Sequence, residues 1–408
     1  MASTKRTAAI PRYRPYAGPT LFSAGFRPFF LLAAVWAALA IPIWLVAYTT
    51  RIVVPSAFPP LIWHAHEMIF GFAAATVAGF LLTAIPNWTG RMPLQGWPLA
   101  ILVMLWLAGR VAVLLSALIG SPLAAIADLS FPATFLVVVA REILAGRNWR
   151  NLPMLGALLL LLLGNLLVHL DALGIAGTAE LGNRIGIGTL LTLISLVGGR
   201  IVPSFTRNWL AKNRPEISPP ASAGRWDLAA LVTTGLGLAV WIFAPDAEVA
   251  RWAELAVGAA VAWRLSRWRG VSTMREPLVL ILHVGYGWLA FGLLLLSVNG
   301  FYTLLPSTAA LHALTVGAIG TMTLAVMTRA SLGHTGRLLS AGPGTTSIYL
   351  LVTLSAILRI AVPLAGSRMS LMYTLAGSAW CAAFGLFAIL YGGLLARPRA
   401  TNDATKSI

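Results

Sequence analysis

A long apolar run of this chain opens with Trp63-His64-Ala65-His66-Glu67-Met68-Ile69-Phe70-Gly71-Phe72 and ends with Pro86-Asn87-Trp88-Thr89-Gly90-Arg91. Two histidines and a glutamate fall within four residues, although the 408-residue chain holds only six histidines and twelve acidic residues. An apolar segment offers these side chains no solvation, so each of them needs a polar partner or a metal. The run therefore predicts a polar centre inside a hydrophobic helix.

The pattern of this run recurs later in the chain. His66-x4-Gly71…Thr89-Gly90-Arg91 matches His312-x4-Gly317…Thr335-Gly336-Arg337 without a gap, and a fainter middle copy places Asn183 where His66 stands. Parallel repeats of this kind build a bundle whose units are related by an axis along the membrane normal. We expect three pseudo-symmetric four-helix units, at about residues 21–150, 151–270 and 271–397, with His66 and His312 facing one shared centre.

The composition places the chain in a membrane. It is 58% hydrophobic and only 10% charged, where a soluble protein carries roughly 25% charged residues. Apolar runs of about 20 residues recur along the chain, as helices that cross a bilayer require. We predict an all-α polytopic membrane protein with about twelve transmembrane helices in one domain, 21–397. A basic segment, 1–20, and a tail, 398–408, flank it. The weakest expected helices are 227–244 and 250–266.

The net charge of +17 fits membrane orientation better than nucleic-acid binding. Most Lys and Arg residues fall in the connections on one side, which predicts that both termini lie in the cytoplasm. The same charges meet anionic lipid head groups. We expect no nucleic-acid partner. The single Cys381 excludes an internal disulfide and a cysteine metal cluster.

Four histidines are expected at one membrane level: His64, His66, His169 and His312. Neutral imidazole is a common metal ligand, and two on separate helices can hold a haem iron. We therefore expect His66 and His312 to be axial ligands of a haem; the alternative is that they make hydrogen bonds between helices. In a regular helix His64 points about 200° away from His66. It shares a face with Glu67, which predicts a second metal site or a supporting role. His169 is a further candidate ligand for that metal.

Arginines within the expected helices are costly unless paired. Arg110 and Arg359 are candidates to hold haem propionates; pairing with Asp128, snorkelling or contact with helix-end carbonyls are the alternatives. The sequence has no CxxCH motif, so any haem is non-covalent and expected to be b-type. We expect His283 to be structural and His334 to lie in a solvated loop.

The chain resembles the NnrS family of bacterial membrane proteins. The segments that carry the resemblance are Gly25-Phe26-Arg27-Pro28-Phe29-Phe30, Trp63–Gly71, Pro86–Arg91, Leu107–Arg110 and Gly333–Arg337. The resemblance implies a twelve-span inner-membrane protein that contains haem and copper. It also implies a link to nitric oxide metabolism and tolerance in denitrifiers and other bacteria.

A more distant likeness is architectural. Haem–copper oxidases and nitric oxide reductases also have twelve spans in a pseudo-threefold arrangement, with a low-spin haem between histidines of helices 2 and 10, where His66 and His312 stand. The sixth and seventh expected helices contain no histidine, so the copper triad of that superfamily is missing. We therefore do not expect an oxygen reductase.

Our leading hypothesis is a haem-binding protein that binds, senses or turns over nitric oxide, supplied by an electron donor or a reductase partner if it is an oxidoreductase. One alternative is a proton- or metal-coupled transporter that uses the intramembrane histidines and Glu67. Another is a subunit that anchors, or delivers copper or haem to, a reductase.

Overall fold

The chain folds into a bundle of long helices. The computed structural model describes residues 16–50 and 52–400, and these ranges contain helices and loops without any strand. Eleven helical runs are long and apolar enough to cross a membrane, which confirms the predicted all-α polytopic class. They are α1 (Phe26–Thr49), Pro60–Thr89, α4 (Trp97–Leu114), α6 (Ser121–Ala145), α7 (Leu152–Ala172), Ala179–Asn213, α10 (Arg225–Phe243), α12 (Pro277–Tyr302), Ser307–His334, α15 (Pro343–Ala361) and α16 (Met369–Ala396).

Three of these runs contain a π-helical segment in the middle, and we call them the broken spans. The first is α2 (Pro60–His66), η2 (Glu67–Ala73) and α3 (Ala74–Thr89); the second is α8 (Ala179–Leu193), η4 (Ile194–Gly198) and α9 (Gly199–Asn213); the third is α13 (Ser307–His312), η6 (Ala313–Gly320) and α14 (Thr321–His334). They contact one another inside the bundle. π-Helical segments are rare and are frequent at functional sites. The broken spans are the three segments that the sequence repeat aligns, although the division into three units stays a prediction.

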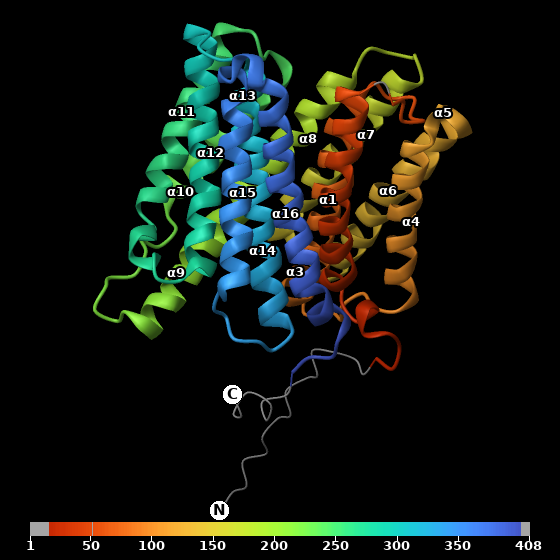
Figure 1. Ribbon diagram of the computed structural model, residues 1–408. Coiled ribbons are helices and arrows are strands. Elements are labelled where there is room, and N and C mark those ends of the chain that lie inside the picture. The colour runs from red at the N-terminus through yellow and green to blue at the C-terminus, as the bar shows by residue number, and fades with distance from the viewer. Residues whose placement is uncertain (1–15, 51, 401–408) are drawn as a thin grey trace, which may run out of the picture.

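Another helix, α11 (Glu248–Ser266), packs between α10 and α12 along one flank of the bundle (Figure 1). It is not among the eleven apolar runs, because it carries Glu248, Arg251, Glu254 and Arg264. This helix is one of the two weakest that the sequence predicted. Its place beside two spanning helices agrees with the expected total of about twelve.

The repeated Thr-Gly-Arg triplets end two broken spans in the same way. Gly90 follows α3 with φ 71°, and Gly336 follows α14 by two residues with φ 76°. Only glycine adopts this left-handed conformation at low cost, so it stops each helix. The sequence repeat thus reflects a repeated backbone conformation.

The first and last long helices meet at one end of the bundle (Figure 1). The buried Arg27 of α1 donates hydrogen bonds to the carbonyl oxygens of Leu395 and Arg397 at 2.7 and 2.8 Å. These contacts satisfy carbonyls that the end of α16 leaves without a partner. Most of the expected segments 1–20 and 398–408 lies outside the described residues.

Candidate functional site

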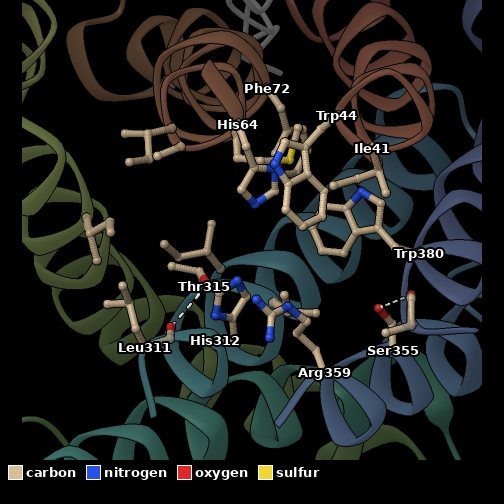
Figure 2. Close-up of a pocket in the computed structure, with 18 of the residues that line it drawn as sticks. Ile41, Trp44, His64, Phe72, Leu311, His312, Thr315, Ser355, Arg359 and Trp380 are labelled. Carbon is tan, nitrogen blue, oxygen red and sulfur yellow. Dashed lines mark hydrogen bonds between the residues drawn. The ribbon is translucent and has the colours of Figure 1, made fainter. Parts of the chain in front are cut away.

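A cavity of about 140 Å³ lies between the first and third broken spans and the helices α1, α8, α15 and α16. We call it the histidine cavity, because His64 of α2 and His312 of α13 both line it, together with Arg359 of α15 (Figure 2). Most of the remaining wall is aromatic or aliphatic. Such a lining, with a few polar groups, is typical of a ligand site.

His312 presents one ring nitrogen without a hydrogen. Its Nδ1 lies 2.5 Å from the carbonyl oxygen of Thr308, one turn earlier. A carbonyl only accepts, so Nδ1 carries the hydrogen, and a neutral ring then keeps an electron pair on Nε2. A backbone carbonyl orients many metal-binding histidines in this way.

Two other groups of the cavity are available to a ligand, whereas Thr315, Ser355 and Trp380 donate to backbone carbonyls of the protein. The ring of His64 stacks on Trp44 with centroids 4.3 Å apart, and the buried Trp44 Nε1 has no partner among the described residues. Arg359 lies over the ring of Tyr373 at 4.8 Å. No Asp or Glu lines the cavity. The cavity therefore offers a positive charge and an N–H to an anionic ligand.

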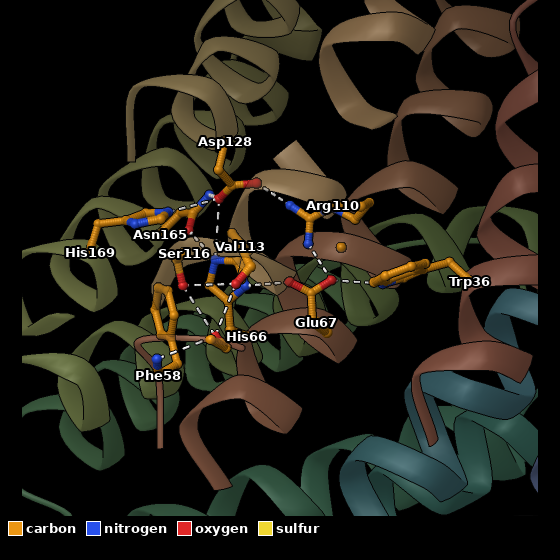
Figure 3. A network of polar contacts seen from close by, with 12 residues as sticks. Trp36, Phe58, His66, Glu67, Arg110, Val113, Ser116, Asp128, Asn165 and His169 are labelled. Carbon is orange, nitrogen blue, oxygen red and sulfur yellow. Dashed lines mark hydrogen bonds and ion pairs between the residues drawn. The ribbon is translucent and has the colours of Figure 1, made fainter. Parts of the chain in front are cut away.

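A second polar centre lies beside the first broken span, and we call it the buried ion network (Figure 3). Glu67, the first residue of η2, accepts hydrogen bonds from His66 Nδ1 at 2.9 Å, Arg110 Nη1 at 2.6 Å and Trp36 Nε1 at 2.7 Å. Both Glu67 oxygens are thereby used. Gly71 makes this possible, because a Cβ there would lie 2.7 Å from Arg110 Nη1 and 2.9 Å from Glu67 Oε2.

Asp128 of α6 is the other carboxylate of the network. It pairs with Arg110 Nη2 and accepts hydrogen bonds from Asn165 Nδ2 at 2.8 Å and His169 Nε2 at 3.0 Å. His66 Nε2 lies 2.8 Å from Asn165 Oδ1 and 3.2 Å from Asp128 Oδ2. Four elements, α2–η2, α4, α6 and α7, are joined through these contacts.

The charges of the buried ion network balance if His66 is protonated. Glu67 and Asp128 are acids and Arg110 is the only permanent cation among these residues, and their side chains are at most 3% exposed. Both His66 ring nitrogens face acceptor oxygens, an arrangement that suits a ring with two N–H groups. Such a ring gives a neutral network, and buried charges are tolerated only when paired.

The same residues contain a group that could hold a metal ion. Ligand atoms of His66, Asp128 and His169 lie within 4.8 Å of one another. They come from three different helices, and all three side chains are buried.

The sequence model described as NnrS protein matches residues 20–399. The chain belongs to the NnrS family. No curated protein matches it. Both polar centres lie within the part of the chain that the family match covers, so they belong to the NnrS domain itself.

For this NnrS family member, the expected pairing of His66 with His312 is not what the structure shows. His66 and His312 stand at equivalent positions of the repeat, and each ends an α-helical segment directly before a π-helix. His312 lines the histidine cavity, whereas His66 is held by Glu67 and Asn165 in the buried ion network. His64, rather than His66, lines the histidine cavity together with His312, because the rings of His64 and His66 point in different directions.

Other expected residues fall into both centres. Arg359 lines the histidine cavity, but Arg110 binds Glu67 and Asp128, the pairing that the sequence left as an alternative to a haem propionate. Glu67 accepts from His66 rather than from His64. The expected shared face of His64 and Glu67 assumed a regular α-helix, and η2 begins at Glu67.

Two further histidines lie away from both centres. His283 is buried and its ring nitrogens lie 3.1 Å from the Val279 carbonyl oxygen and 3.2 Å from Thr206 Oγ1. His334 was expected in a solvated loop; it is instead the last residue of α14, half-buried against Phe26. The ring contact with Phe26 explains the difference.

Sequence reasoning missed three side chains that complete the centres. Asn165 had a usable signal, since it is a lone amide in a leucine-rich run and lies four residues before His169, on the same helix face. Trp44 had none, because tryptophans near helix ends are usual in membrane proteins. Trp36 lies near the middle of α1, where its indole N–H needs a partner, but only the packing shows that this partner is Glu67.

Proposed function

We propose that this protein binds haem in the inner membrane and binds, senses or turns over nitric oxide there, with His64 and His312 as the residues that hold the iron. One observation carries the proposal: two histidines from two different broken spans line one apolar cavity. Two imidazoles on separate helices form a well-known donor set for haem iron.

The donors of the histidine cavity suit a haem. Nε2 of His312 is free of hydrogen, and Arg359 and the unpartnered Trp44 N–H can bind propionate carboxylates. The volume of the histidine cavity is small for a haem. A cavity of about 150 Å³ holds a benzene molecule, so the walls around 140 Å³ must separate further to admit a porphyrin ring.

The protein's own residues then have distinct roles. Thr308 orients His312, and the stacked Trp44 fixes the ring of His64. The apolar walls keep water out, which strengthens every polar contact inside. A haem iron supplies an open or exchangeable position for a diatomic gas. Because His64 and His312 would both hold the iron, one of them would have to release it for a gas to bind.

Haem binding is tested by the visible absorption spectrum of the detergent-purified protein, oxidised and reduced, with and without nitric oxide. We expect a haem band that shifts with nitric oxide. His64→Ala and His312→Ala should each lower the haem content at least several-fold, because each removes one of two ligands. His334→Ala is the matched control for His312→Ala, since it lies at the opposite end of the same broken span. Wild-type haem content in both cavity variants overturns the assignment.

Copper is the second cofactor of the proposal, held by His66, Asp128 and His169 after His66 has lost a proton and the ion has replaced the Nε2–Oδ2 contacts of both histidines. The Nε2–Oδ2 separations of 3.2 and 3.0 Å are close to the edge of roughly 3.3 Å in a tetrahedral site with bonds of about 2.0 Å. Imidazole suits copper. Asp128→Asn should lower the copper bound per protein and leave haem content unchanged. Asp227→Asn, a buried aspartate that pairs with Arg264 elsewhere, is the control.

Transport remains the competing function, because charged residues inside a membrane often mark an ion path. The near-complete burial of Glu67 and Asp128 weighs against it, since a transported ion needs access. A protein that stays colourless when expressed with ample haem and iron, and that moves a substrate into liposomes, refutes haem binding in favour of transport.

A further inference from the structure

A second cavity, of about 90 Å³, follows the histidine cavity along the broken spans. The histidine cavity is lined by residues 64–72, 187–190 and 311–319 of these spans, and the second by residues 73–81, 190–201 and 319–326. All three broken spans therefore line both cavities in succession. Leu190 and Ile319 line both, so the two cavities meet at these side chains. We call the second one the gas cavity, for the reasons that follow.

The walls of the gas cavity offer nothing to hold water. Its only polar side chains are Thr76 and Thr323. The hydroxyl of Thr76 donates to the Phe72 carbonyl at 3.3 Å, and that of Thr323 donates to the Gly320 carbonyl at 2.9 Å. Both hydroxyl hydrogens are thus used within their own helices. A buried water needs two to four polar partners, and apolar cavities without them stay dry but take up apolar solutes.

The size of the gas cavity suits a small solute. Its 90 Å³ is about three times the roughly 30 Å³ that one water occupies in the liquid. A noble-gas atom or a diatomic molecule fits this space.

We propose that the gas cavity is a binding site for a small apolar gas. From there the gas enters the histidine cavity by passing between Leu190 and Ile319. The identity of the natural gas as nitric oxide rests on the proposed function. The affinity of the cavity for an apolar gas follows from its walls alone. An acyl chain of a lipid is the competing occupant.

Xenon is the probe, because it binds apolar cavities and needs no haem. We expect crystals of the full-length protein under xenon pressure to show a xenon atom in the gas cavity. Val197→Phe places a ring in the cavity wall and should reduce the occupancy at least several-fold. Val232→Phe, the same substitution at an exposed position of α10, should leave it unchanged. An acyl or detergent chain in the cavity, or no xenon there in the wild type, overturns the proposal.

A second measurement separates this inference from the proposed function. In haem-loaded protein, Val197→Phe should slow the association of carbon monoxide by a few-fold without changing the absorption spectrum. An unchanged association rate overturns the proposal that gas enters the histidine cavity between Leu190 and Ile319. If the protein binds no haem, the proposed function fails, while the xenon result still decides whether the gas site exists.

Discussion

His64 and His66 are two positions apart and have separate environments. His64 lies against an indole at the edge of an apolar cavity, and His66 has an oxygen acceptor at each ring nitrogen. A metal ligand needs a free electron pair, and only the histidine outside a closed hydrogen-bond network has one to offer without breaking polar contacts. The environment of each ring, more than its presence in a motif, therefore separates His64, which can bind a metal directly, from His66, which must first lose a proton and a hydrogen bond.

Arg110 should be the most sensitive charged residue of the protein. Arg110→Met leaves Glu67 and Asp128 buried without their guanidinium, and loss of one partner of a buried pair costs about 3–5 kcal/mol. We expect a markedly lower unfolding temperature in detergent. Arg91→Met is the control, because the Arg91–Glu142 pair is partly exposed and such pairs contribute about 0–1 kcal/mol. Equal effects of the two substitutions contradict the role of the network.

At the scale of the helix, the sequence predicted which segments correspond but not how they are wound. The repeat placed His66 and His312 at equivalent positions, and both do end an α-helical segment before a π-helix. The faces of His64, His66 and Glu67 were deduced for a regular α-helix. A π-helix closes its hydrogen bonds five residues on and so turns the following side chains to other directions. The seven residues of η2 are too few, and too uniformly apolar, to show this in a hydrophobic period. Side-chain directions after His66 were therefore beyond the reach of pattern analysis.

Gly71 of η2 should be essential to the packing of the buried ion network. In Gly71→Ala the new Cβ lies 2.7 Å from Arg110 Nη1 and 3.0 Å from Trp36 Nε1, which forces the network apart. Overpacking of this kind costs about 1–3 kcal/mol, so the unfolding temperature should fall. Gly156→Ala in α7 is the matched control, since its Cβ meets nothing within 4 Å and alanine favours a helix. An unchanged unfolding temperature in Gly71→Ala would show that the buried ion network can shift without loss of stability.

At the scale of the whole molecule, the number of crossings is linked to the position of the chain ends. The start of α1 and the end of α16 lie at the same end of the bundle (Figure 1), which requires an even number of crossings. Eleven apolar runs alone would place the ends on opposite sides. The helix α11 restores the even number, and the buried Arg264 on it has partners: it pairs with Asp227 at 3.0 Å and donates to the Ser195 carbonyl at 2.8 Å. Hydropathy measures composition, so it cannot show that a charged helix is shielded by its neighbours.

If α11 crosses the membrane, the loops at its two ends lie on opposite sides. The single Cys381 can be replaced by alanine and one cysteine placed at Asp246, before α11, or at Val271, after it. In intact cells a membrane-impermeant maleimide should label Asp246→Cys alone, because the positive-inside rule places the Arg267–Arg275 loop in the cytoplasm; Val271→Cys should react only after lysis. Cysteine at Ser340, in the loop between α14 and α15, should behave like Val271→Cys. Labelling of both Asp246→Cys and Val271→Cys in intact cells would mean that α11 does not cross the membrane. The number of crossings would then be odd, and the two termini could not both lie in the cytoplasm.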